Sequence, residues 1–117
     1  MVKRYDLEDR TQAFARRVRD FIKKLPKDLA NIEYCRQLIR SSASIGANYI
    51  EANEALSKKD FLMRIKISRK ECKESRFWLR LITPPDGQRQ EWEDLIEEAT
   101  ELLLILSAIV RNAQERE

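Results

Sequence analysis

Three short breaks divide the sequence into four long stretches in which apolar residues recur at helical spacing. Pro26 closes the first stretch, Ser57 opens the third, and the run Thr83-Pro-Pro-Asp-Gly87 closes it. Proline interrupts a helix, whereas a serine followed three residues later by a carboxylate, here Asp60, is typical of a helix start. The pattern therefore predicts helices at about residues 6–25, 28–56, from the Ser57 cap to 82, and 90–113.

The links between these helices are short, and short links place consecutive helices side by side and antiparallel. The expected fold is all-α: an up-down-up-down antiparallel four-helix bundle, with residues 1–117 in one domain. Only 2 Gly and 3 Pro among 117 residues also favour long helices over many short strands. No stretch approaches the ~20 apolar residues of a membrane span, and the N-terminus lacks the apolar segment of a signal peptide. A cytoplasmic protein without a membrane partner is expected.

The sequence carries few of the residues on which catalysis usually depends. It has no histidine, which removes the commonest general base and the commonest metal ligand. It also has no glycine-rich phosphate-binding motif and no paired C-x-x-C. Cys35 and Cys72 are expected to be reduced, buried thiols. We therefore expect a protein that is not an enzyme and that needs no cofactor or metal.

Small residues dominate the middle of the second helix, in the run SSASIG at residues 41–46. Folding the second and third helices back on each other about Ser57 places Gly46 opposite Ser68 and Ser42 opposite Cys72. The same register places Tyr49 opposite Ile65 and Cys35 opposite Leu79. Small residues that face one another allow close backbone approach, which offsets a helix-propensity cost of up to ~1 kcal/mol for a glycine. The two cysteines are about 10 Å out of step in this register, too far for a disulfide.

The third helix carries many more bases than acids, and most of the bases share one arc of its surface. One interpretation is a solvated face whose charges have no partner outside the chain. The other is a phosphate-binding stripe that holds RNA or DNA by its backbone without reading sequence. The candidate nucleic-acid-binding residues are Lys66, Arg69, Lys70, Lys73, Arg76 and Arg80.

Apolar residues also lie away from the expected core stripes of the third and fourth helices. A wide core seam with a few exposed apolar side chains explains one or two of them. A second stripe on two helices of one small chain favours a surface for self-association. The candidate oligomer-interface residues are Met63, Ile67, Trp78, Leu81, Leu104 and Ile105.

Polar residues near the end of the second helix form a weak candidate for a metal site. Glu51 and Glu54 point outward, whereas Asn53 falls on the core stripe, so their side chains diverge. The preferred interpretation is structural. Asn53 is expected to satisfy backbone groups near the turn, and the two glutamates are expected to pair with Arg or Lys on a neighbouring helix or subunit.

Residues 36–82 and the opening segment, residues 5–26, resemble the four-helix bundle proteins encoded in 23S ribosomal RNA intervening sequences. The signature S-x-S-I-x-x-N-x-x-E-A begins at Ser42 and ends at Ala52, and a basic helix containing Glu71, Glu74 and Trp78 follows it. That family is similar to the accessory variability protein of diversity-generating retroelements, a ring of five protomers that works with a reverse transcriptase and its RNA. The resemblance implies a ring-like homo-oligomer, a pentamer, that binds nucleic acid or an enzyme such as a reverse transcriptase.

Two functions remain open at this point. In the first, the chain binds nucleic acid through the third helix. In the second, it is a structural or protein-interaction scaffold with no nucleic-acid binding. The bases of the third helix then form ion pairs across subunit contacts with four acids of the fourth, Glu91, Glu97, Glu98 and Glu101.

Overall fold

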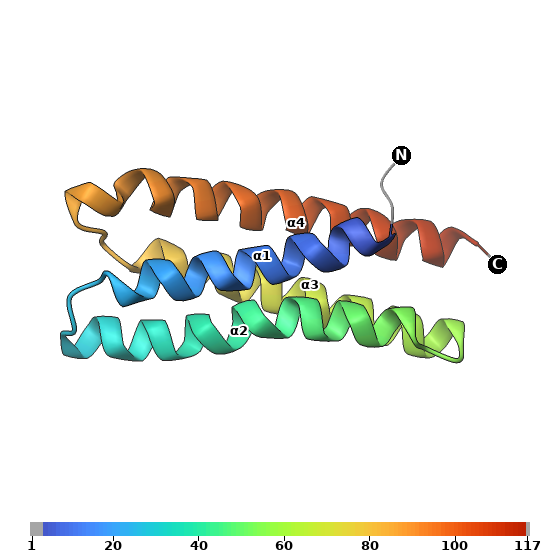
Figure 1. Cartoon of the computed structure of the whole chain (residues 1–117). Helices are drawn as coiled ribbons and strands as arrows, with labels where there is room; N and C mark the ends of the chain where they lie inside the picture. The colour runs from blue at the N-terminus through green and yellow to red at the C-terminus, as the bar shows by residue number, and fades with distance from the viewer. Residues whose placement is uncertain (1–3, 117) are drawn as a thin grey trace.

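Four α-helices joined by short links make up the chain in the computed structural model, which describes residues 4–116 (Figure 1). The all-α prediction is confirmed, because the described residues contain helices and no strand. None of these helices is long and apolar enough to cross a membrane. The elements are α1 (Arg4–Lys23), α2 (Leu29–Asn53), α3 (Lys58–Leu81), the short 3-10 helix η1 (Asp86–Gln88) and α4 (Arg89–Glu115).

The helix ends follow local capping chemistry. The Asp28 carboxylate accepts a hydrogen bond from the Asn31 backbone N–H, and the Ser57 hydroxyl accepts one from the Asp60 N–H, so both side chains cap a helix start. The expected cap at Ser57 is thus confirmed. The prediction that the second helix reaches Leu56 is wrong, because α2 ends at Asn53. Residues 54–56 form the turn in which the chain changes direction before the Ser57 cap of α3. Leu56, predicted as the last residue of that helix, is 99% exposed on the link between α2 and α3.

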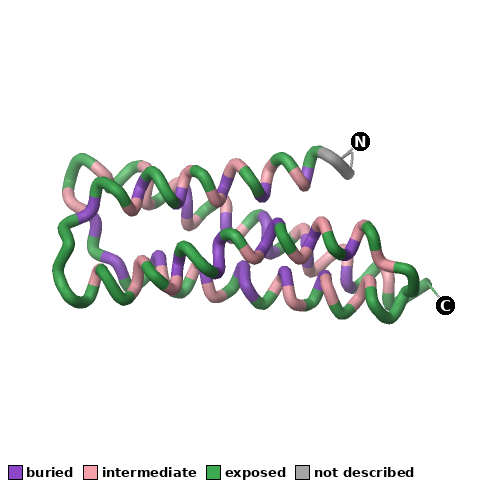
Figure 2. The backbone as a smooth tube through the Cα atoms, turned by 60° about the horizontal axis from the view of Figure 1, so that its bottom comes forward, coloured by how far each residue is buried: buried purple, intermediate pink, exposed green. Residues whose placement is uncertain are grey.

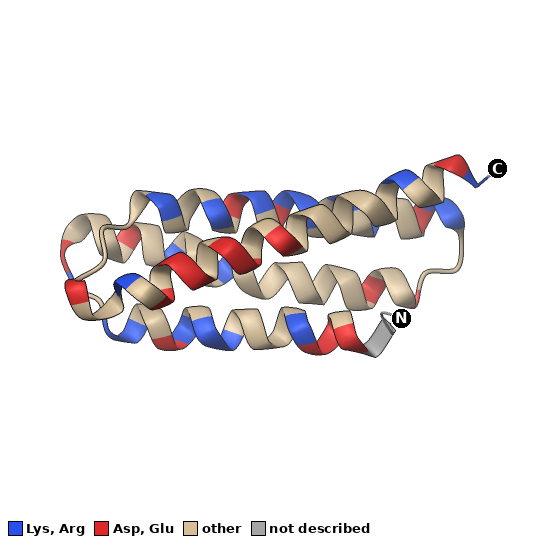
Figure 3. Ribbon diagram, turned by 90° about the horizontal axis from the view of Figure 1, so that it is seen from above, with Lys and Arg blue, Asp and Glu red and all other residues tan. Residues whose placement is uncertain are grey.

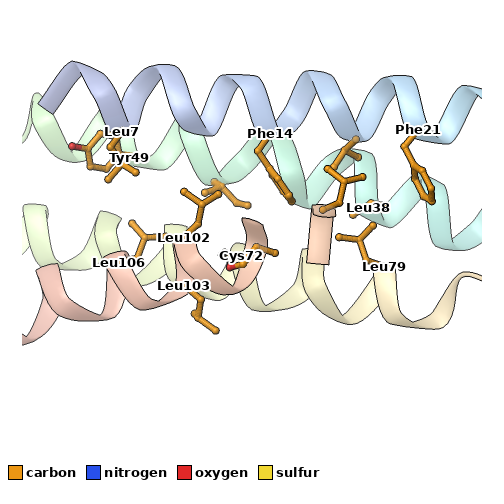
Figure 4. Close-up of a cluster of buried hydrophobic side chains, with 14 of the residues drawn as sticks. Leu7, Phe14, Phe21, Leu38, Tyr49, Cys72, Leu79, Leu102, Leu103 and Leu106 are labelled. Atoms are coloured by element: carbon orange, nitrogen blue, oxygen red, sulfur yellow. Dashed lines mark hydrogen bonds between the residues drawn. The ribbon is translucent and has the colours of Figure 1, made fainter. Parts of the chain in front are cut away.

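One apolar core runs along the inside of the four helices (Figures 2 and 4). Each helix supplies large side chains to it that are fully buried, among them Phe14, Leu38, Ile65 and Leu106. The contact between α2 and α3 is the most extensive, and that between α1 and α4 is smaller than the contacts of α1 with α2 and of α3 with α4. The positions of the helices therefore depend chiefly on the α2–α3 pair.

Buried hydroxyls hold α2 and α3 close together. The Ser41 and Ser75 hydroxyl oxygens lie 2.9 Å apart, and the Ser68 hydroxyl donates to the Ile45 carbonyl at 2.7 Å. Residue numbers rise along α2 as those of the contacting residues fall along α3. Small side chains with satisfied hydroxyls let the two backbones approach without leaving buried polar groups unpaired.

The predicted partner of Gly46 is wrong. A Cβ atom at Gly46 would lie 2.8 Å from the Thr11 hydroxyl and 3.2 Å from the Thr11 Cβ, so this glycine faces α1 and not Ser68 of α3. Cys72 is likewise turned toward α4, where its thiol donates to the Ala99 carbonyl. The predicted register of α2 against α3 was close to correct along the helix axis. It was wrong in treating all small residues of α2 as facing α3. Because α2 touches both α1 and α3, its small residues divide between two faces.

Other side chains of α2 also differ from what its helical repeat predicts. That repeat predicts Ile32 and Ile39 in the core, but both are substantially exposed, because the residues of α2 that meet α1 and α3 lie on other faces of the helix. Asn53 donates to the Glu8 carboxylate of α1 at 2.9 Å and not to backbone groups near the turn. Glu51 and Glu54 are exposed and form no ion pair with another described residue of this chain, so pairing across a subunit contact stays a prediction.

We expect replacement of Gly46 by leucine to destabilise the protein. The added side chain must push Thr11 and α1 away from α2, at a cost on the order of 1–3 kcal/mol. Urea unfolding followed by circular dichroism measures the loss. Ala47 is exposed on the same helix, so Ala47→Leu is the matched control and should leave stability near the parent value.

Coupling between pairs of substitutions tests which helix Gly46 faces. The cost of Gly46→Ala should fall in a Thr11→Ala background, because the nearest obstructing atom is then absent. It should not change in a Ser68→Ala background. Coupling to Ser68 with none to Thr11 would contradict the packing described above.

Candidate nucleic-acid interface

The surface of α3 that points away from the core is strongly basic. Ile65, Cys72 and Leu79 are fully buried on one side of the helix. Lys66, Lys73 and Arg80 are exposed on the other. In Figure 3, Lys and Arg segments follow α3, Asp and Glu segments occupy the first half of α4, and more Lys and Arg segments follow α1. Acidic α4 therefore packs between two basic helices.

The structure divides the six predicted phosphate-binding residues into two groups. Lys66, Lys70, Lys73 and Arg80 are exposed. Arg69 and Arg76 are half-buried, and the Arg76 guanidinium donates to the Thr100 hydroxyl of α4 at 3.1 Å. Arg76 thus helps to hold α3 against α4, and the four exposed bases are the accessible part of the stripe. We call these four residues the basic face.

Two acids of α3, Glu71 and Glu74, are paired with α2. Glu71 is only 8% exposed, and Arg40 of α2 lies 3.3 Å from it and 3.2 Å from Glu74. Lys70 lies 3.6 Å from Glu74 along the same helix, in an exposed and therefore weak pair. Among the described residues this is the only ion pair that includes a member of the basic face. The positive charge of the other three members is not matched by a contacting carboxylate.

Three acids of α4 are paired with bases of α1. Arg10 contacts Glu98 at 2.8 Å and Glu101 at 3.0 Å, and these contacts raise the pKa of the Arg10 guanidinium, with the Glu98 hydrogen bond as the largest cause. Arg17 lies 3.4 Å from Glu91. Three of the four acids that the scaffold hypothesis assigns to bases of α3 on a neighbouring subunit are therefore paired inside this chain.

The predicted interface residues differ in how far they reach the surface. Met63, Leu81 and Leu104 are exposed, Leu104 by 66%. Ile67 is half-buried, and Trp78 and Ile105 pack partly against the core. The Trp78 ring lies against Tyr34 of α2, with the ring centres 6.1 Å apart, and the buried indole N–H has no hydrogen-bond partner.

Sequence reasoning missed one large exposed side chain on α3. Phe77 is 54% exposed and contacts Trp78 edge-on, with the ring centres 5.0 Å apart. Its position was readable from the helical repeat, because at about 100° per residue Phe77 lies opposite the core stripe. Leu29, Ile32 and Ile39 are further exposed apolar residues of α2 that the sequence did not assign to a surface.

The described residues offer little for covalent or metal chemistry. They contain no group of three or more Cys, Asp or Glu side chains that could hold a metal ion. Both cysteines are free thiols, and burial raises the pKa of Cys72 from its ordinary value of 9.0 to about 12. Burial also raises the pKa of Cys35. A thiol with a raised pKa is protonated at neutral pH and is a poor nucleophile.

The fold and this surface define a small all-α protein with a basic face on its third helix. The family model of the 23S rRNA-intervening sequence proteins matches residues 3–108, so the chain belongs to that family, as its sequence signature predicted. A similar solved structure is that of a protein with unknown function from the S23 ribosomal protein family of Bacteroides thetaiotaomicron VPI-5482. The two are 31% identical with a TM-score of 0.80, and the match covers 94% of this chain and 99% of that one. No curated protein matches the sequence.

We expect the two thiols to react at different rates with a disulfide reagent such as dithionitrobenzoate. Cys35 is half-buried and should react in the native protein, whereas Cys72 should react only after unfolding. A Cys35→Ser variant should therefore be unreactive until guanidinium is added, and fast labelling of this native variant would contradict the burial of Cys72.

The neutral Cys72 thiol also makes the stability of the protein depend on pH. Because burial disfavours the thiolate, its contribution to stability is present below pH 9.0 and is lost as the pH rises toward about 12.

Proposed function

We propose that the chain is a non-enzymatic, homo-oligomeric, antiparallel four-helix bundle protein that binds the phosphate backbone of nucleic acid. The basic face of α3 is the binding surface. The observation that carries this proposal is the distribution of ion pairs. Three acids of α4 are paired with Arg10 and Arg17 of α1, and two acids of α3 are paired with Arg40 of α2. Lys66, Lys73 and Arg80 stay exposed without a carboxylate partner among the described residues.

Binding through such a face depends on charge and does not distinguish base sequences. Each phosphate that a lysine or arginine neutralises releases a counterion, so affinity falls steeply as salt concentration rises. A single basic helix supplies few contacts, and its affinity alone is weak. Several copies in one assembly act together through their effective concentration.

We propose a ring as the form of that assembly. The exposed residues Met63 and Leu81 lie on one helix and Leu104 on another, so two different surfaces are available to neighbouring subunits. One repeated contact between unlike surfaces generates a closed ring when its rotation closes. The family resemblance suggests five subunits.

The alternative function is a structural or protein-interaction scaffold without nucleic-acid binding. Large apolar side chains exposed on α2, α3 and α4 support protein contacts in either case. An enzyme that acts on nucleic acid, such as a reverse transcriptase, is then the partner to test. The two functions differ in whether the isolated protein binds RNA or DNA.

We expect the protein to be a homo-oligomer in solution. Light scattering during size-exclusion chromatography at micromolar concentration should give a multiple of the 13.9 kDa chain mass, and five times that mass for a pentamer. Leu104→Glu places a charge at an exposed apolar position, where it should weaken a contact between subunits without disturbing the core. A monomeric parent would contradict the assembly.

We expect charge reversal of the basic face to abolish nucleic-acid binding. Lys66, Lys73 and Arg80 are exposed and unpaired among the described residues, so their replacement by glutamate leaves the fold intact while repelling phosphates. Fluorescence anisotropy with labelled RNA and DNA measures binding at low and physiological salt. The parent should bind and should lose affinity steeply as salt is added.

A second triple variant makes the same change in net charge elsewhere. Arg16 and Lys23 are exposed on α1 and Lys24 is exposed directly after it, and their reversal to glutamate should reduce binding far less. Equal losses in both variants would show that binding reports total charge and not the α3 surface. A parent that binds neither RNA nor DNA at low salt would leave the scaffold as the function.

A further inference from the structure

Phe77 lies on the same side of α3 as the basic face, between Lys73 and Arg80 along the helix. At about 100° per residue, Lys66 and Lys70 lie within about 20° of Phe77 around the helix, and Lys73 and Arg80 lie within about 60°. The four bases extend over about 21 Å along the axis, since each residue rises about 1.5 Å. Phe77 itself is 54% exposed. An aromatic ring is therefore exposed among the charges proposed to hold phosphates.

The ring is also supported from behind. Trp78 meets Phe77 edge-on at 5.0 Å between ring centres and lies against Tyr34 of α2 at 6.1 Å. Trp78 packs partly against the core. Phe77 is thus the outermost of three aromatic residues that lead from the α2–α3 seam to the surface. A side chain held this way loses little conformational freedom when a ligand stacks on it.

The two flanks of Phe77 differ in character. Trp78 marks the α2 side through its contact with Tyr34, and Arg76 marks the α4 side through its hydrogen bond to Thr100. Met63 and Leu81 lie toward the first side, and Lys73 and Arg80 lie toward the second. The apolar flank suits a protein contact and the basic flank suits phosphates. Phe77 lies at the boundary, close enough to the bases to act with them.

We propose that Phe77 is a stacking platform for an unpaired base, so that the basic face selects single-stranded over double-stranded nucleic acid. This inference rests on the proposed function and specifies its ligand. Proteins that bind single strands combine a positive surface along the backbone with aromatic rings on which bases stack. A base within a duplex is covered on both faces by its neighbours and cannot stack on a ring at the protein surface. Duplex binding would therefore use the lysines and arginines but not Phe77.

The test compares one mixed-sequence oligonucleotide as a single strand with the duplex formed by adding its complement, in both RNA and DNA forms. The parent should bind the single strand more tightly at the same salt concentration. Phe77→Ala should weaken single-strand binding by about 5- to 150-fold and leave duplex binding unchanged. Phe77→Tyr keeps the aromatic face and should retain single-strand affinity, whereas Phe77→Leu keeps only apolar bulk and should not.

Leu56→Ala is the matched control, since Leu56 is an exposed apolar residue on the link between α2 and α3, outside the basic face and outside the proposed subunit interface. It should leave single-strand binding unchanged. Thermal unfolding and elution volume establish that each variant keeps its fold and assembly state. Loss of the oligomer in Phe77→Ala would identify the Phe77 side chain as part of a contact with a second copy of the chain and would overturn the stacking role.

The outcomes separate this inference from the function on which it rests. Parent-like single-strand binding by Phe77→Ala, together with loss of binding in the charge-reversed α3 variant, would overturn the stacking role and keep the phosphate-binding face. Equal losses for single strand and duplex in Phe77→Ala would also overturn it. Absence of binding to every probe by the parent would overturn the proposed function itself.

Discussion

The packing of α2 against two neighbours at once is the constraint on which the rest of the structure depends. Its small residues are divided between two faces, with Gly46 against Thr11 of α1 and Ser41 against Ser75 of α3. Close approach on both faces leaves no room for larger side chains, and buried hydroxyls must find partners within the seam. The position of α3 follows from this packing, and with it the direction in which the outer surface of α3 faces.

The charges of the molecule are arranged by the same packing. Glu71 is nearly buried beside α2 and is balanced by Arg40, whereas three acids of α4, Glu91, Glu98 and Glu101, are balanced by Arg10 and Arg17 of α1. Each of these pairs holds two helices together and removes a negative charge from the neighbourhood of the basic face. Lys66 and Lys73 of α3 take part in no such ion pair with another described residue. A surface with unbalanced charge and one aromatic ring is therefore available for a ligand.

Much of the fold was readable from particular residues. Pro26, Ser57 and the Pro-Pro-Asp-Gly run located the breaks, because proline restriction and hydroxyl capping act over a few residues. The height at which α2 and α3 meet was also close to correct. Side-chain partners were less predictable: Gly46, Cys72 and Asn53 all face helices other than those expected. A register predicted for two helices alone does not show which of their residues will contact a third or fourth helix.

The sequence by itself determined the four helices, their approximate ends and the excess of bases on the third, since these depend on local propensity and on spacing along one chain. Only the tertiary structure decided which charges are paired and which are free. Arg10 and Glu98 are distant in sequence yet 2.8 Å apart, and Arg40 meets Glu71 across the α2–α3 seam. The contact of Trp78 with Tyr34 of α2, which supports the exposed Phe77 ring, was decided in the same way. Interactions between residues far apart in the chain depend on helix rotation and packing angle, and many distant side chains set these together.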